Sequence, residues 1–271
     1  MLEVSRSGYY DWRDRRSDPG PLELRRQKLL TEIRVEQELG RGVYGAPRVH
    51  AGLMARGVKV CLNTVAKLMK EAGIRSKRTA RFRVRTTDSR HDHLPAPNLL
   101  DRQFEAELPD QKWLCDITYV PTQEGMLYLA SVLDVCSRRI VGWSMSTSLA
   151  AELCLDALGM ALQRRRPQEG LLHHSDRGVQ YACEAYQHLL QEHGISCSMS
   201  RSGNCYDNAM MESFHSTFKS ELVYLQPDGR FESIEQARRM IFEFIEVFYN
   251  RQRRHSAIGY QSPEQFEASL N

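Results

Sequence analysis

The sequence lacks the features of an exported or membrane-spanning protein. It has no run of 18 or more apolar residues, which excludes a transmembrane helix, and its first 16 residues lack the apolar centre of a signal peptide. Its seven cysteines form no C-x-x-C pair and no zinc-finger spacing, so we interpret them as reduced thiols of a cytoplasmic protein. Internal repeats and low-complexity tracts are also absent.

Charge is distributed unevenly along the chain. With 271 residues and 41% apolar composition, the protein can form a hydrophobic core and more than one domain. Residues 41–90 carry 13 Lys and Arg against two acids, a net charge of +11, which leaves −8 for the rest of a chain whose total is +3. This sorting indicates a polyanionic partner, nucleic acid in the first instance, although a solvated basic face has the same composition.

Residues 22–74 predict a small helical domain that binds DNA. Apolar periodicity favours a helix over 22–39, and glycines separate it from two short helices at 47–56 and 64–72. Two short helices joined by a tight turn are typical of a helix-turn-helix, and a helical hairpin without DNA contact is the alternative. The candidate DNA contacts lie on or just after the last of these helices: Lys67, Lys70, Arg75, Lys77 and Arg78.

Finer expectations concern the ends of these helices and the segments around them. Leu39 is expected to point inward, and Asn63 or Thr64 is expected to cap the third helix. Residues 1–21 are assigned to an N-terminal tail. Residues 75–108 are basic and then contain prolines, which predicts a linker that can lie along a charged partner.

Residues 109–271 predict an α/β fold. The stretch 113–120 is apolar on both faces, as in a central strand, and strands at 126–136 and 139–147 follow at hairpin distances. Helices and short strands then alternate: helix 150–165, strand 171–174, helix 180–193, strand 195–199, a helix within 204–222 and a long helix at 233–250. We expect a mixed sheet with helices on both sides.

Three carboxylates in this region are candidates for chemistry. Glu212 flanks the apolar stripe of its helix, where a carboxylate needs a partner. Asp116 is the acid within an otherwise apolar strand, and Asp176 ends a short strand at a glycine-containing turn. If the three converge, they can hold divalent cations, and oxygen-only ligands favour two Mg²⁺ or Mn²⁺ ions over zinc.

Each carboxylate also has a structural interpretation. Asp116 could be a satisfied polar residue on an edge strand, and Asp176 could be ordinary turn chemistry. Glu212 could pair with Lys219 or Ser216 across turns of its own helix.

Other acids compete for the same role. Asp134 is the main rival, because it lies on a strand next to that of Asp116. Asp207 is better explained as a helix cap, and Glu221 points away from the flank on which Glu212 lies.

The spacing of the acids and several sequence blocks resemble a known family. Between Asp176 and Glu212 lie 35 residues, as in the Asp-Asp-Glu signature of retroviral integrases and their bacterial relatives. The blocks are more specific: WLCDITYV, VLDVCSRRIVGW, HHSDRGVQY, SGNCYDNAMMESFHSTFKSEL and YNRQRRHSAIGYQSPEQF. Together they are similar to the second-frame (OrfB-type) product of the insertion-sequence family three (IS-three) transposases, whose helix-turn-helix resembles residues 40–74.

The resemblance implies an RNase-H-like integrase core in which Asp116, Asp176 and Glu212 bind the metal. It places Lys219 in contact with DNA near the reacting phosphate, and it makes Asp134 a structural residue. In the family an upstream first-frame (OrfA-type) segment carries terminal-repeat binding and a dimerising coiled coil. Because this chain begins without such a segment, we expect it to act with a first-frame product or as a fusion, as a homo-oligomer on DNA.

The sequence therefore predicts a DNA transposase that nicks transposon ends with metal ions and joins the freed 3′-hydroxyl to another DNA. Further phosphate contacts are expected from Arg251, Arg253 and Arg254. A bacterial cytoplasmic, nucleoid-associated location is expected. Two alternatives stay open at this point: a non-catalytic DNA-binding regulator of a full transposase, and an RNase-H-like nuclease acting on RNA–DNA hybrids.

Overall fold

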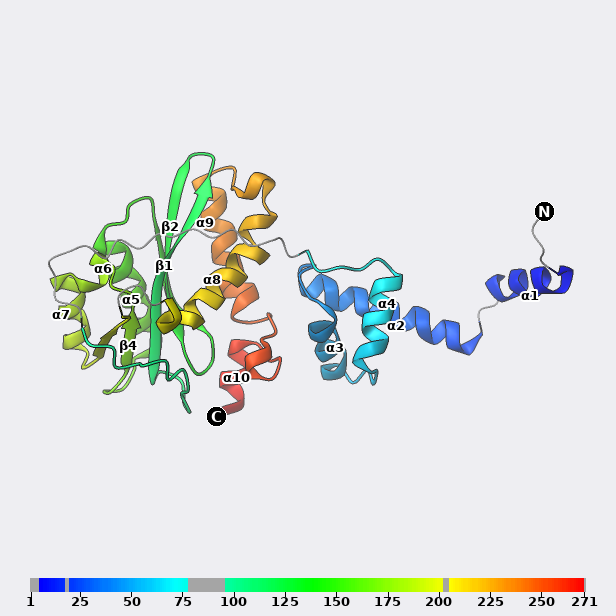
Figure 1. Ribbon diagram of the computed structural model, residues 1–271, viewed down its shortest axis with the longest axis horizontal. Coiled ribbons are helices and arrows are strands. Elements are labelled where there is room, and N and C mark those ends of the chain that lie inside the picture. Colours follow the sequence, from blue (N-terminus) through cyan, green and yellow to red (C-terminus); the bar gives the residue numbers. More distant parts are fainter. Residues whose placement is uncertain (1–4, 18–19, 78–95, 202–204, 271) are drawn as a thin grey trace. The chain divides into compact units, whose positions relative to one another are not determined.

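The chain folds into two compact units, residues 1–77 and 78–271. The computed structural model describes residues 5–17, 20–77, 96–201 and 205–270. Within these ranges the first unit consists of helices, and the second is a sheet flanked by helices (Figure 1). No helix in the described ranges is long and apolar enough to cross a membrane.

The first unit contains the predicted helix-turn-helix. Its helices are α1 (Arg6–Ser17), α2 (Pro21–Leu39), α3 (Ala46–Ala55) and α4 (Leu62–Glu71). Helices α2, α3 and α4 contact one another around a small apolar core formed by Ile33, Val49, Leu53, Val65, Leu68 and Met69. Gly57 follows α3 with φ +80°, a left-handed conformation that glycine adopts without steric cost, and this residue turns the chain toward α4.

The buried face of α2 differs from the prediction at the C-terminal end of the helix. Leu39 is 55% exposed, so the expectation that it points inward is wrong. At 100° per residue it lies about 120° around the helix from the buried Ile33. Glu36 is buried instead, because its carboxylate pairs with Arg56 (Nε–Oε1 2.9 Å) and occupies the space that a Cβ on Gly52 would fill.

Helix α4 also begins earlier than predicted. Cys61 is its N-cap residue, and neither Asn63 nor Thr64 caps it. The Thr64 hydroxyl lies 3.0 Å from the Cys61 Sγ instead, since both side chains belong to the first turn.

The second unit is built on a five-stranded mixed sheet, which confirms the predicted fold class (Figure 1). The strands are β1 (Lys112–Thr122), β2 (Gly125–Asp134), β3 (Ile140–Ser146), β4 (Leu172–Ser175) and β5 (Ser196–Met199), in the spatial order β3-β2-β1-β4-β5. The first three strands are antiparallel, whereas β4 pairs in parallel with β1 and β5 in parallel with β4. β1 is therefore central, as its apolar sequence predicts.

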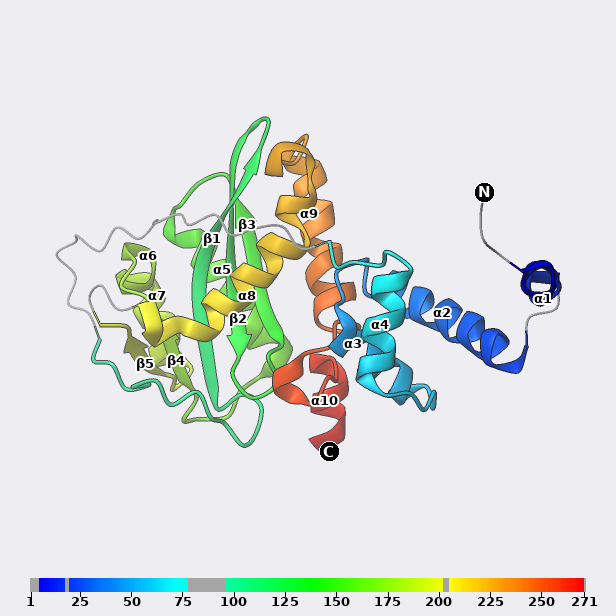
Figure 2. The ribbon, with the colours of Figure 1, turned by 45° about the vertical axis from the view of Figure 1, so that its right-hand side comes forward.

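Helices cover both faces of this sheet (Figure 2). On one face, Trp113 and Cys115 share a core with α5 (Ala151–Arg165), α6 (Val179–Ala182) and α7 (Glu184–Glu192). Successive strand residues point to opposite faces, so Leu114 and Asp116 face the other side. That side is covered by α8 (Ala209–Glu221) and α9 (Ile234–Phe242), and the chain ends with α10 (Pro263–Leu270).

Two predicted helices are interrupted in the structure. The helix expected over 180–193 breaks at Cys183, which is extended, and Gln187 Nε2 donates to the freed Tyr181 carbonyl at 2.7 Å. The helix expected over 233–250 continues α9 as a π-helix, Glu243–Tyr249. Its wider turns direct four of seven side chains into the core: Phe244, Ile245, Phe248 and Tyr249.

The end of the predicted linker lies against the sheet. Leu100 is 1% exposed, and the backbone N–H groups of Leu99 and Leu100 donate to Ser198 Oγ at 2.9 and 3.2 Å. The Met199 N–H donates to the Pro97 carbonyl at 3.3 Å. Residues 96–100 thus satisfy polar groups of the edge strand β5.

Asp207 joins this segment to the loop before α8. It is fully buried and accepts hydrogen bonds from Asn98, Arg102 and Arg201, so the prediction that it caps the helix is wrong. Asn208 occupies the N-cap position. The hydrogen bonds from Arg201 hold the pKa of Asp207 well below its usual range.

Replacing Asp207→Asn should destabilise the second unit by about 1–3 kcal/mol at pH 7, because it removes charge-assisted hydrogen bonds from a buried acceptor. A group with a depressed folded-state pKa contributes stability that is present above its unfolded pKa and lost as the pH falls. The difference between wild type and variant should therefore shrink as the pH falls below about 4. Chemical denaturation across this range measures it.

Asp101→Asn is the matched control, because this carboxylate also faces Arg201 (3.2 Å) but is 66% exposed. A difference between wild type and Asp207→Asn that does not change with pH would contradict the assignment of the stability to the ionised carboxylate.

Candidate active site

Asp116 and Asp176 lie at the same level of two neighbouring strands. The parallel ladder between β1 and β4 pairs Lys112 with Leu172 and Leu114 with His174. Asp176 directly follows β4, and the same register continued for two residues would set it level with Asp116. Residues in register on parallel strands point to the same face, here the face that α8 covers.

Glu212 reaches this region from α8, in its first turn. The side chain is exposed, while Met211, Phe214 and Phe218 on the same helix are buried. The Asn208 amide donates to the carbonyl of Cys115 at 3.1 Å, which fixes the start of α8 beside the residue that precedes Asp116. Glu212 thus lies outside the buried stripe of α8, as predicted, and its side chain is exposed.

The carboxylates influence one another electrostatically. Burial raises the pKa of Asp116 well above its usual value, and the negative charges of Asp176 and Glu212 raise it further. Lys219 acts in the opposite direction on the same group. Burial lowers the pKa of Lys219, and the charge of Asp116 partly offsets this effect. Three acids and one lysine thus form a single electrostatic cluster.

Asp176 accepts a hydrogen bond within a turn and also belongs to the electrostatic cluster. Its Oδ1 accepts the Gly178 N–H at 2.9 Å, which is the turn chemistry that the sequence also allowed. The two interpretations are compatible, because the turn orients a carboxylate at the end of β4.

The chemistry of these three carboxylates suits a divalent cation. All three offer carboxylate oxygens, the ligands that Mg²⁺ and Mn²⁺ prefer, and a cation would relieve their mutual repulsion. Across the described residues, no three His, Cys, Asp or Glu side chains are already gathered closely enough to hold a metal ion. A cation bound by this cluster would therefore draw its ligands together.

Asp134 is structural. Its Oδ1 accepts hydrogen bonds from the Ser137 N–H (2.8 Å) and hydroxyl (2.9 Å), and its Oδ2 accepts the Asp110 N–H at 2.7 Å. Oδ1 thus holds the turn after β2 and Oδ2 holds the loop before β1, and the side chain is fully buried.

His215 belongs to the cluster, although the sequence did not single it out. It lies one turn after Glu212 on the sheet side of α8 and is 9% exposed. Its Nδ1 lies 3.5 Å from Asp116 Oδ2. Burial and the charge of Lys219 lower the pKa of His215 to about 3, so the imidazole is neutral near pH 7. The sequence did contain a signal for this residue, because a histidine stands at a helix position where the apolar stripe predicts a core residue.

The predicted DNA contacts on the second unit differ in exposure. Arg251 is 60% exposed and lies 3.6 Å from Glu264, and Arg254 donates to the Tyr260 carbonyl at 3.3 Å. Arg253 is 2% exposed and donates to both oxygens of Glu221 at 2.7 and 2.8 Å. The expectation that Arg253 contacts phosphate is therefore wrong, because its guanidinium neutralises a buried carboxylate.

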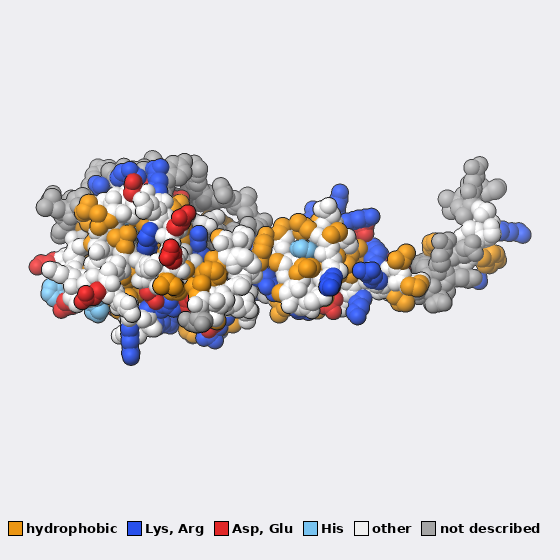
Figure 3. All heavy atoms as spheres, turned by 90° about the horizontal axis from the view of Figure 1, so that it is seen from below, with side chains coloured by type: hydrophobic (Ala, Val, Ile, Leu, Met, Phe, Trp, Pro, Cys, Tyr) orange, Lys and Arg blue, Asp and Glu red, His pale blue; other side chains and the backbone are white. Residues whose placement is uncertain are grey.

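The predicted contacts on the first unit are exposed wherever the structure describes them: Lys67, Lys70, Arg75 and Lys77. Arg78 lies outside the described residues. Figure 3 shows Lys and Arg side chains among apolar ones on one face of this unit.

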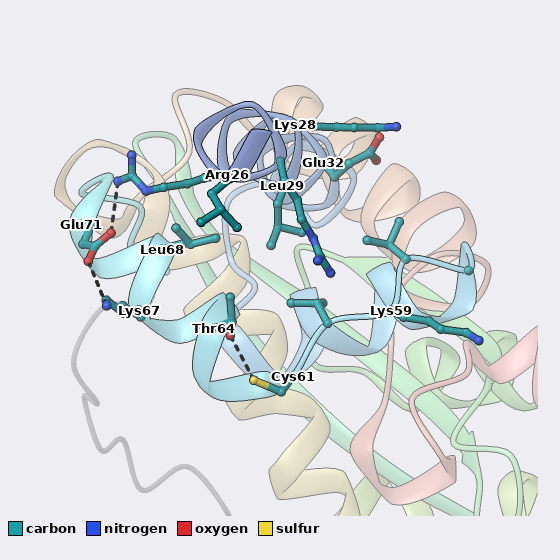
Figure 4. Close-up of a pocket in the computed structure, with 15 residues that line it drawn as sticks. Arg26, Lys28, Leu29, Glu32, Lys59, Cys61, Thr64, Lys67, Leu68 and Glu71 are labelled. Carbon is teal, nitrogen blue, oxygen red and sulfur yellow. Dashed lines mark hydrogen bonds and ion pairs between the residues drawn. The ribbon is translucent and has the colours of Figure 1, made fainter. Parts of the chain in front are cut away.

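A hollow of about 1260 Å³ lies beside α2 and α4 in the first unit (Figure 4). Five basic residues line it: Arg25, Arg26, Lys28, Lys59 and Lys67. The first three lie outside the basic segment 41–90 for which the sequence predicted a polyanionic partner. The Glu71 carboxylate in its wall lies 3.1 Å from Arg26 and 3.9 Å from Lys67.

Comparison with known families matches both units. Residues 106–205 match a family described as an integrase core domain, a second family of the same description matches residues 193–263, and residues 24–82 match an HTH-like domain. A chain of the simian T-cell lymphotropic virus intasome, solved with the PP2A regulatory subunit B56 gamma, shares the fold. It has a TM-score of 0.50 and 14% identity, over 80% of this chain and 69% of that one.

Similar proteins span nearly the whole sequence. The 31 kDa protein of insertion element IS600 from Shigella sonnei is 44% identical over 98% of this chain and 96% of its own length. Transposase InsF for insertion sequence IS3A from Escherichia coli K12 is 42% identical, covering 98% and 91%. The transposase of IS904 from Lactococcus lactis is 41% identical, covering 92% and 97%. These similarities confirm the resemblance seen in the sequence, and the chain belongs to the family of IS3-type insertion-sequence transposases.

Proposed function

We propose that Asp116, Asp176 and Glu212 hold the divalent cations with which this transposase cuts and joins DNA. The observation that carries the proposal is the register of β1 and β4, which sets two aspartates level on the face beneath α8. The raised pKa of Asp116 supports it, because the charges of Asp176 and Glu212 contribute to that shift. A divalent cation would offset the repulsion among the three carboxylates.

The reaction consists of two phosphoryl transfers. Water first attacks a phosphodiester at the transposon end and frees a 3′-hydroxyl, which then attacks a phosphodiester in the target DNA. Two Mg²⁺ or Mn²⁺ ions would activate the attacking oxygen and stabilise the leaving one. The three carboxylates would hold these ions beside the reacting phosphate, and no covalent bond between protein and DNA is required.

The basic residues hold the DNA backbone. Lys219 is half-buried next to the cluster, where its ammonium group can approach the reacting phosphate. Further phosphate contacts come from Lys67, Lys70, Arg75 and Lys77 on the first unit, from Arg78, and from Arg251 and Arg254 on the second unit. These contacts should bind DNA with little preference for its base sequence, since phosphates are alike in every sequence.

The partners follow from the same reaction. The DNA ligands are the terminal repeats of the element and a target duplex. We propose that the chain acts as an oligomer together with a first-frame product or as a fusion to it, in the bacterial cytoplasm at the nucleoid.

Asp176→Asn and Glu212→Gln should each lower nicking and strand transfer by at least about 100-fold, because each loses a negatively charged metal ligand worth several kcal/mol in the transition state. The assay uses oligonucleotides carrying the ends of the element, with Mg²⁺ or Mn²⁺ and with the first-frame product added. Asp156→Asn is the control, since this acid is exposed on α5, on the opposite face of the sheet. Activity that survives in either variant would refute the assignment of that carboxylate as a metal ligand.

Replacing Lys67 and Lys70 together by alanine should weaken DNA binding similarly for all sequences. The slope of log K against log salt should fall in magnitude by about 2, since each lost phosphate contact releases about one counterion fewer. Binding isotherms at several salt concentrations measure it. Lys112→Ala provides a comparison, because this ammonium group donates to the Gln103 carbonyl within the second unit. An unchanged slope in the double variant would remove these lysines from the interface.

A further inference from the structure

Each oxygen of the Asp116 carboxylate has a neighbouring nitrogen. Its Oδ1 accepts the N–H of the next residue, Ile117, at 2.8 Å. Its Oδ2 faces His215 Nδ1 at 3.5 Å. Each carboxylate oxygen has two lone pairs, so both contacts leave capacity to bind a cation. The side chain is 24% exposed, which keeps it accessible to a ligand entering from solvent.

His215 is placed to act on Asp116. It approaches from α8, whereas Asp116 lies on β1, so the contact joins the helix that carries Glu212 to the strand that carries the first aspartate. Lys219, one turn further along α8, is the charged group that acts on the imidazole. The Phe214 ring lies 5.5 Å from that of His215 and limits its rotation.

The charge of a ligating carboxylate gives this contact a direction. A carboxylate that holds a cation is ionised and can only accept a hydrogen bond, so the ring nitrogen that faces it has to be the donor. Next to Asp116, the tautomer with the proton on Nδ1 is therefore favoured. His215 Nε2 is buried and has no hydrogen-bond partner among the residues described, which places no competing demand on the tautomer.

We propose that His215 is a positioning residue that donates from Nδ1 to Asp116 Oδ2 and holds that carboxylate in its metal-binding orientation. The proposal rests on the proposed metal-binding role of Asp116. Outer partners of ligating groups fix ligand orientation, and their loss typically weakens metal affinity by about 10–100-fold. His215 itself does not contact the reacting phosphate in this scheme.

Two amide substitutions distinguish the two ring nitrogens. In His215→Asn the amide nitrogen takes the place of Nδ1, and in His215→Gln it takes the place of Nε2. His215→Phe keeps a flat ring and removes both nitrogens. A residue that only fills space would tolerate Phe best, whereas a donor at the Nδ1 position is restored by Asn alone.

The test is the metal-induced rise in melting temperature of the full chain without DNA, titrated with Mn²⁺ after treatment with a chelator. The midpoint concentration should increase by about 10–100-fold in the Phe and Gln variants and stay within about threefold of wild type in the Asn variant. In nicking assays at fixed metal, kcat should fall in the Phe and Gln variants while KM for DNA is unchanged.

Each outcome has a definite meaning. If wild type shows neither a metal-induced shift nor nicking with the first-frame product present, the metal site itself is refuted. If wild type responds and all variants respond equally, only the role of His215 is overturned. A Gln variant that matches wild type while Asn does not would assign the contact to Nε2 and also overturn it. Should Phe fail to fold, the comparison of Asn with Gln decides.

Discussion

The packing of α8 against β1 is the interaction on which the proposed active site depends. One face of α8 inserts Met211, Phe214 and Phe218 into the core, and Phe214 packs edge-on against Tyr249 with ring centroids 4.9 Å apart. This apolar contact is non-directional, so it cannot by itself set the helix at one rotation. The Asn208 amide, bonded to the backbone of β1, supplies the direction. Glu212 is therefore positioned by a hydrophobic stripe and one polar anchor.

The same interface contains polar atoms that a simple core would avoid. Ser131 Oγ, Asn208 Oδ1 and His215 Nε2 are buried, and none has a hydrogen-bond partner among the residues described. Ser131 is the register partner of Asp116 on β2, and His215 approaches the Asp116 carboxylate from α8. An unsatisfied buried polar group costs about 1–3 kcal/mol. Accepting that cost at the interface that carries Asp116 is expected where a site needs orientation more than the fold needs stability.

The sequence allowed the sheet, the helix-turn-helix and the flank position of Glu212 to be predicted, because each rests on local periodicity. It did not allow the partners of buried charges to be assigned. Asp207 looked like a cap and Arg253 looked like a phosphate contact, since both types are common in those roles near helix ends and in basic runs. Their actual partners, Arg201 for the first and Glu221 for the second, are set by tertiary packing. The anchoring of residues 96–100 on β5 escaped prediction for the same reason, because it depends on a serine about 100 positions away.

The start of α4 gives the protein a chemically distinct thiol. Among the cysteines whose side chains the structure describes, Cys61 is the exposed one, and its hydrogen bond with Thr64 lowers its pKa. Burial raises the pKa of Cys115 and Cys154 behind the sheet, which makes them poor nucleophiles. A thiol-reactive fluorophore should therefore modify Cys61 in preference to these two. The DNA-binding unit thus carries its own labelling position, on a helix separate from every carboxylate of the active site.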